Sequence, residues 1–113
     1  MNIENIGDEL SALVDKFELT KSCLHLDELS ARLTNLMKER ESLTFWNNLD
    51  YAMQTNKEIK SLQDLFAEVQ FLQDQITGLI KTVKELETET DLEMLNLAFS
   101  ELLEIRDKVD ELN

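Results

Sequence analysis

The 113-residue sequence contains no proline, and it contains only two glycines. Because these residues form and terminate turns, a chain so poor in both favours a few long helices. β-Branched residues are sparse and alternating apolar–polar runs are absent, so strands are not predicted. The sequence also lacks a signal-peptide pattern and any apolar run near the ~20 residues of a membrane-spanning helix. We therefore expect an all-α fold, one helical domain over residues 1–113, no membrane partner and a cytoplasmic location.

Histidine and cysteine are scarce, which removes the commonest catalytic and metal sites. His25 is the only histidine, and no Ser or Cys with a third orienting group can be identified beside it. Cys23 and His25 lack the further ligands of a zinc site, and a single cysteine excludes an intramolecular disulfide. Gly7 and Gly78 are too far apart for a glycine-rich phosphate loop. The sequence predicts no enzyme activity, no metal and no cofactor, with His25 a half-exposed helix residue.

Basic residues are also few. Eleven Lys and Arg face 24 Asp and Glu, which gives a formal net charge of −13. Binding to a phosphate backbone depends on basic side chains, so direct nucleic-acid binding over this acidic surface is not expected. The charge is uneven, because residues 85–113 hold ten acids and two bases, a net of −8. These observations favour a basic protein partner.

The sequence does contain a long apolar stripe of helical period. Residues 49–86 contain no proline, and from Ile59 their apolar positions advance in steps of three and four. Such a period keeps one apolar stripe on one side of a helix and requires a partner along it. A second stripe follows in residues 92–112 after a short polar connection, and a short connection makes the two arms antiparallel. The sequence thus predicts a long antiparallel helical hairpin.

Two shorter helices are predicted before this hairpin. The first lies within residues 1–24, with Asp8 as a plausible N-cap. Its apolar positions are Leu10, Leu13, Val14 and Phe17. The second begins at Asp27 and ends near Glu41–Ser42. Its stripe is Leu26, Leu29, Leu33, Leu36 and Met37. The whole is a bundle of about four helices.

An aromatic turn over residues 42–48 precedes the long helix. We interpret Phe45, Trp46 and Asn48 as a structural clasp, with the two aromatic side chains closing the end of the bundle. Either Asn47 or Asn48 can cap the helix that follows. The alternative is that the aromatic pair anchors a partner, since Trp is enriched at binding hot spots.

Five acids bracket the other end of the long helix. They are Glu85, Glu87, Glu89, Asp91 and Glu93. Thr90 followed by Glu93 fits a capping box for the last helix, and acids suit the positive end of a helix dipole. A solvated helix end is the interpretation we favour, and a docking site for a basic partner is the alternative.

Taken together, these residues resemble the N-terminal domain of bacterial class-I peptide chain release factors. The resemblance covers roughly residues 24–113, and its most specific part is the aromatic turn, which indicates the type-two members. The matching positions are Leu24-His25-Leu26-Asp27, Leu29, Arg32-Leu33, Leu36, Phe45-Trp46-Asn47, Ala52, Lys57-Glu58, Leu62, Asp91 and Glu111-Leu112. The family often carries proline beside the aromatic turn, whereas this chain has none.

The resemblance implies a role in translation termination. Family members act through a Gly-Gly-Gln tripeptide for peptidyl-tRNA hydrolysis and a Ser-Pro-Phe tripeptide for stop-codon reading, and neither occurs here. We therefore expect a first domain alone, whose gene continues past Asn113. The partners implied are the ribosome, through a stalk-base protein of the large subunit, and the recycling GTPase, release factor 3. The competing hypothesis is a free-standing acidic helical adaptor or coiled-coil dimer unrelated to termination.

Overall fold

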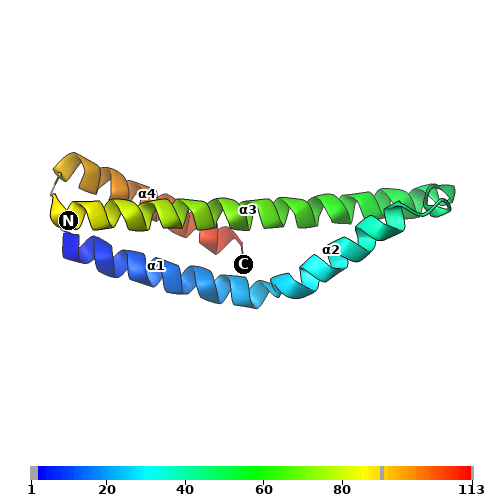
Figure 1. Ribbon diagram of the computed structural model, residues 1–113, viewed down its shortest axis with the longest axis horizontal. Helices are drawn as coiled ribbons and strands as arrows, with labels where there is room; N and C mark the ends of the chain where they lie inside the picture. Colours follow the sequence, from blue (N-terminus) through cyan, green and yellow to red (C-terminus); the bar gives the residue numbers. More distant parts are fainter. Residues whose placement is uncertain (1–2, 90, 113) are drawn as a thin grey trace. The chain divides into compact units, whose positions relative to one another are not determined.

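The computed structural model describes residues 3–89 and 91–112, and every regular element in that part of the chain is helical (Figure 1). The elements are α1 (Ile3–Leu24), α2 (Leu26–Arg40), a short 3-10 turn η1 (Phe45–Asn47), α3 (Leu49–Thr88) and α4 (Leu92–Glu111). The all-α prediction and the helix order are therefore confirmed. None of the described helices is long and apolar enough to cross a membrane.

The chain divides into two compact units. Unit 1 contains Met1–Leu24 and Gln70–Asn113, and unit 2 contains His25–Val69. Helix α3, which is 40 residues long, belongs to both. The expectation of one domain stays a prediction, and the two units are described in turn.

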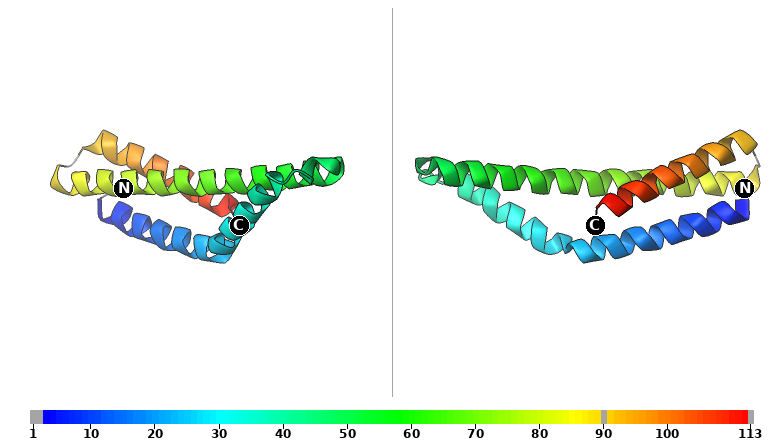
Figure 2. Two further views of the ribbon diagram at one scale, coloured as in Figure 1. Left: turned by 45° about the vertical axis from the view of Figure 1, so that its right-hand side comes forward. Right: turned by 180° about the vertical axis from the view of Figure 1, so that it is seen from behind.

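Unit 1 is built from α1, the C-terminal half of α3, and α4. The views in Figures 1 and 2 show α4 beside that half of α3 and antiparallel to it, as the sequence predicts. At 20 residues, α4 can accompany only half of α3. The backbones of α1 and α4 also lie close together, which the sequence did not indicate.

The apolar stripes of the three helices form the core of unit 1. Its buried apolar side chains are Ile6, Leu10, Leu13, Phe17, Leu72, Ile76, Leu79, Val83, Leu86, Leu95, Ala98, Leu102, Ile105 and Val109. They recur every three or four residues along each helix, which places one face of each helix inside. Four further apolar side chains of these helices and of the residue after α4, Val14, Ile80, Phe99 and Leu112, are only partly buried.

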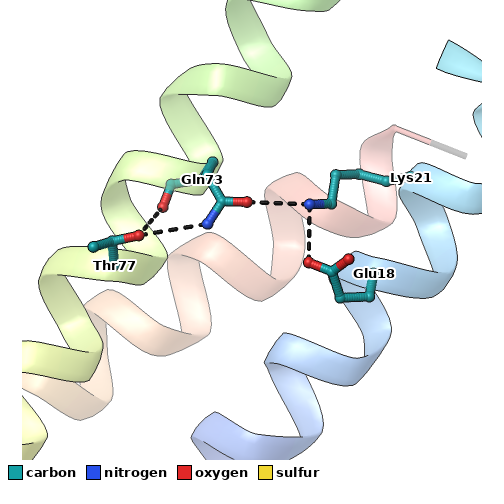
Figure 3. Close-up of polar contacts among 4 residues, drawn as sticks. All are labelled: Glu18, Lys21, Gln73 and Thr77. Carbon is teal, nitrogen blue, oxygen red and sulfur yellow. Dashed lines mark hydrogen bonds and ion pairs between the residues drawn. The ribbon is translucent and has the colours of Figure 1, made fainter. Parts of the chain in front are cut away.

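Polar contacts hold the edges of this core. Figure 3 shows Lys21 of α1 reaching α3, where its Nζ donates to Gln73 Oε1 at 3.1 Å, while it also pairs with Glu18 at 2.9 Å. Gln73 Nε2 in turn donates to Thr77 Oγ1 at 3.4 Å. These side chains are half-buried or exposed, so they contribute little beside the apolar core.

Two ion pairs join α1 to α4. Arg106 lies 3.7 Å from Glu9, and Lys16 pairs with Asp110. Both pairs are substantially exposed, so their net contribution is small. Glu9 precedes Lys16 in α1, and their partners Arg106 and Asp110 follow the same order in α4, so these two helices run in the same direction.

The start of α1 differs from the prediction. Asp8 is not an N-cap, because the helix already includes Ile3 and Asp8 lies in its second turn. Ile6 is fully buried, so the apolar stripe begins upstream of Leu10 and stabilises the extra turn. Gly7 is accommodated within the helix, where an added Cβ would meet no neighbouring atom.

Unit 2 is a smaller hairpin of α2 and the N-terminal half of α3, joined by the aromatic turn. Its hydrophobic cluster consists of Leu36, Ile59 and Leu62, with Leu29 and Leu33 packed against it while partly exposed. The stripe predicted for α2 is therefore present but only half-buried. Met37, which was expected in it, is exposed. Two helices cover one side of each other and leave flanking positions open to water.

His25 separates α1 from α2 in a backbone conformation unusual for a non-glycine residue. Its φ is 53° and its ψ is 54°, the left-handed region, and its side chain makes no capping hydrogen bond. It is exposed and lies outside both helices, so its prediction as a half-exposed helix residue is wrong. Nothing in residues 20–24 reads as a helix stop, and the local sequence therefore gave no sign of this break.

Candidate functional site

The five predicted acids gather at the connection between α3 and α4, a surface we call the acidic turn (Glu85, Glu87, Glu89, Asp91 and Glu93). All five side chains are exposed. In the described part of the chain none of them forms an ion pair with Lys or Arg. The acidic turn therefore presents uncompensated negative charge.

The backbone of the acidic turn is held by local hydrogen bonds. At the end of α3 the Glu89 N–H donates to the Glu85 carbonyl at 3.1 Å, and Thr88 Oγ1 donates to the same carbonyl at 2.9 Å. At the start of α4, Asp91 Oδ1 accepts from the N–H groups of Glu93 at 3.0 Å and Met94 at 3.2 Å. Both helix ends are thus capped, which fixes the positions from which the acids project.

The cap of α4 is Asp91, so the predicted Thr90–Glu93 capping box is wrong. Thr90 itself lies outside the described residues. Asp91 combines a side-chain acceptor with a negative charge at the positive end of the helix dipole, and both properties favour it as a cap. The carboxylate of Asp91 therefore has a structural role, whereas the carboxylates of the other four acids accept none of these capping hydrogen bonds.

An open depression of about 650 Å³ lies at the acidic turn. Its lining combines carboxylates with apolar side chains, namely Glu85, Thr88, Glu89, Asp91, Leu92, Glu93 and Met94. Leu92 is largely exposed beside the acids. A surface of this chemistry suits a basic protein segment that carries some apolar area.

In the aromatic turn, defined as residues 42–48, the two aromatic side chains of the predicted clasp differ in burial. Phe45 is buried, whereas Trp46 is 57% exposed, so the expectation that both aromatic side chains close the bundle is wrong for Trp46. The two rings still meet edge to face, with centroids 4.9 Å apart. Phe45 is thus the buried member of the aromatic pair, and Trp46 packs against it while remaining exposed.

Asn48 caps α3 as the sequence indicates. Its Oδ1 accepts from the N–H of Tyr51, the third residue of α3, at 3.1 Å, which is the usual N-cap hydrogen bond at the start of a helix. The Tyr51 hydroxyl donates to Glu39 Oε2 of α2 at 2.6 Å. This bond, burial and the negative charge of Glu39 together raise the pKa of Tyr51 above its ordinary value. The turn is thereby tied to both helices of unit 2.

The residues considered for chemistry do not come together into a site. Cys23 is exposed near the end of α1, and His25 is exposed at the junction that follows. Among the described residues there is no group of three or more His, Cys, Asp and Glu side chains that could hold a metal ion. The candidate surfaces are therefore the acidic turn and the aromatic turn.

Comparison with known proteins gives one informative similarity. The chain is 30% identical over 94 residues to peptide chain release factor 2 of an Exiguobacterium species. The aligned region is 83% of this chain but only 26% of that protein, so the chain spans about a quarter of the length of the relative it matches. No family model matches the sequence. This similarity gives modest support for a release-factor-like region in the chain.

Proposed function

We propose that this chain is a ribosome-docking N-terminal domain of a type-two peptide chain release factor, without catalytic activity of its own. The similarity to release factor 2 is the observation that carries the proposal. The all-helical fold and the absence of a Gly-Gly-Gln tripeptide from the sequence support it. In this role the chain acts in stop-codon-dependent translation termination, while hydrolysis and decoding require parts that it does not contain.

The acidic turn is the surface proposed to dock. Four exposed acids without a structural partner, at a capped connection between two helices, suit a basic surface of a stalk-base protein on the large ribosomal subunit. Release factor 3 is a second proposed partner. Complementary charge of this kind acts mainly on the rate of association and is weakened by salt.

A charge-reversal pair tests the docking surface. Glu87→Lys/Glu89→Lys changes two acids of the acidic turn and leaves the Asp91 cap intact, whereas Glu101→Lys/Glu104→Lys makes the same charge change at exposed positions in the middle of α4. The first variant should associate with large ribosomal subunits several-fold more slowly at low salt, and the second should change little. Equal association rates for the two variants would count against the acidic turn.

The absence of activity is tested separately with a pretermination ribosomal complex carrying labelled peptidyl-tRNA. The chain alone should release no peptide above background, whereas a full-length release factor added to the same complex should release it. Stop-codon-dependent release by this chain would overturn the proposal.

A further inference from the structure

Exposed apolar side chains that the proposed function does not use lie in the aromatic turn and at the start of α3. They are Leu43, Trp46, Leu49 and Met53, which are 97%, 57%, 65% and 53% exposed. Leu49 and Met53 are one helical turn apart on the same side of α3. We call these four side chains the apolar knob. Tryptophan is a residue that proteins usually bury for the most part, so its exposure here needs an explanation.

Local contacts hold Trp46 and the backbone of the turn in place. Trp46 packs against the buried Phe45, and Phe45 also meets the Tyr51 ring edge to face at 6.2 Å. Asn48 caps α3 directly beneath Leu49, and the hydroxyl oxygens of Ser42 and Thr44 lie 3.1 Å apart across the turn. An apolar surface that is ordered before binding loses little conformational entropy when it is covered.

The knob is also the least charged stretch of a highly charged chain. Asp50 is the only charged residue in positions 42–56, although charged residues make up 31% of the sequence. A basic partner would find almost nothing to attract it here. A second copy of the chain meets few like charges at this turn, chiefly Asp50 and Glu39, while its net charge of −13 opposes contact through most other surfaces.

We propose that two copies of this chain associate through their apolar knobs, with Trp46 at the centre of a symmetric contact. Each copy then presents the same surface to the other, so the contact is self-complementary. Four large side chains at these exposures offer an apolar area of the order of 500 Å² per copy, since a large side chain carries roughly 150–250 Å². Stable interfaces bury about 800 Å² per partner, so this dimer is weak and depends on concentration. The proposal is independent of the release-factor proposal.

The single tryptophan of the chain makes a direct test possible. Sedimentation velocity and Trp46 emission are measured on the whole chain from about 1 to about 500 µM, the range in which so small an interface dissociates. The mass should rise toward that of a dimer and the emission should shift to the blue over the same concentrations. Added salt should strengthen association, because it screens the repulsion between two acidic chains.

Two variants locate the contact. Met53→Glu adds a negative charge to the apolar knob near the N-terminus of α3, where the helix dipole favours an acid. It should weaken dimerisation about tenfold or more, because a charge without a partner is costly to bury. Leu97→Glu makes the same kind of change at a 70% exposed position of α4 and should leave dimerisation unaffected apart from a small effect of net charge. Far-UV circular dichroism confirms that both variants are folded. A monomer with unchanged emission at every concentration, or association that Met53→Glu leaves intact, overturns the proposal.

Discussion

Units 1 and 2 use the same kind of helix but reach different degrees of burial. In unit 1, three helices surround a continuous core, whereas in unit 2 two helices cover one side of each other. Leu10, Leu13 and Phe17 of α1 are accordingly buried, while Leu29 and Leu33 of α2, at equivalent spacing, are only half-buried. A third helix is what converts an apolar stripe into a core.

The two units also differ in charge. Unit 1 holds 16 acids and 6 bases, a net of −10, whereas unit 2 holds 8 acids and 5 bases, a net of −3. The better-packed unit thus carries most of the charge repulsion, and the less-packed unit carries the exposed apolar knob. The comparison indicates that packing and surface chemistry can be varied separately along one chain, and the following substitutions test each side of it.

The largest difference should come from a matched pair of core truncations. Leu102 and Leu36 are 1% and 2% exposed, so Leu102→Ala and Leu36→Ala remove the same atoms from units 1 and 2. We expect Leu102→Ala to lower the free energy of unfolding by about 3–5 kcal/mol and Leu36→Ala by about 2–3 kcal/mol. The cost is lower at Leu36 because its half-buried neighbours can move into the cavity that the substitution leaves. Urea denaturation measures both. A larger cost at Leu36 would refute the account of packing.

The helix caps should show a smaller effect. Asp91→Ala removes a charged acceptor of two N–H groups in unit 1, and Asn48→Ala removes a neutral acceptor of one in unit 2. The expected losses are about 1–2 kcal/mol for Asp91→Ala and about 0.5–1 kcal/mol for Asn48→Ala, measured by thermal denaturation. Asp91→Asn, which keeps the cap and removes the charge, should recover most of the loss; no recovery would mean that charge alone matters there.

The junction between the units should gain stability from a glycine. His25→Gly relieves a left-handed conformation that costs a side chain energy, and the gain should be about 0.5–1 kcal/mol after the added chain entropy. The matched control is Ala31→Gly, at an exposed interior position of α2, which should cost about 1 kcal/mol. Melting temperatures that fall for both variants would show that His25 is held by contacts that outweigh its backbone conformation.

The smallest effect concerns the bond between Tyr51 and Glu39 in unit 2. The pKa of Tyr51 is raised in the folded chain, so its contribution to stability is present below its ordinary pKa of about 10 and is lost as the pH rises through the folded-state value. Tyr51 is the only tyrosine, so tyrosinate absorbance reports it alone. Glu39→Gln should lower the midpoint of that titration. An unchanged midpoint would mean that Glu39 does not set the pKa.

The sequence predicted the regular parts of the fold well. The extents of α3 and α4 follow from a stripe of period near 3.5, and Asn48 was among the two residues expected to cap α3. These features depend on residues within one or two helical turns, where spacing and side-chain chemistry decide the outcome.

The predictions that failed depend on how far a neighbouring helix extends. Asp8 resembles a helix start, but the burial of Ile6 prolongs α1 past it. Trp46 resembles a core residue, but the two helices of unit 2 enclose only Phe45. The cap of α4 is instead decided by local chemistry, because Asp91 combines an extended backbone with a charged acceptor at the start of the helix. The outcomes for Asp8 and Trp46 are set by tertiary packing, which the preference of a single residue does not determine.

Helix α3 crosses from unit 2 to unit 1 without a proline, a glycine or any other stop near Val69 and Gln70. A helix can therefore end at almost any turn in that region at similar cost. When the chain is heated or denaturant is added, the boundary between helical and unfolded backbone can move along α3, because no residue in this region fixes its position. The half of α3 that packs with α1 and α4 should be the last part of this helix to lose its structure.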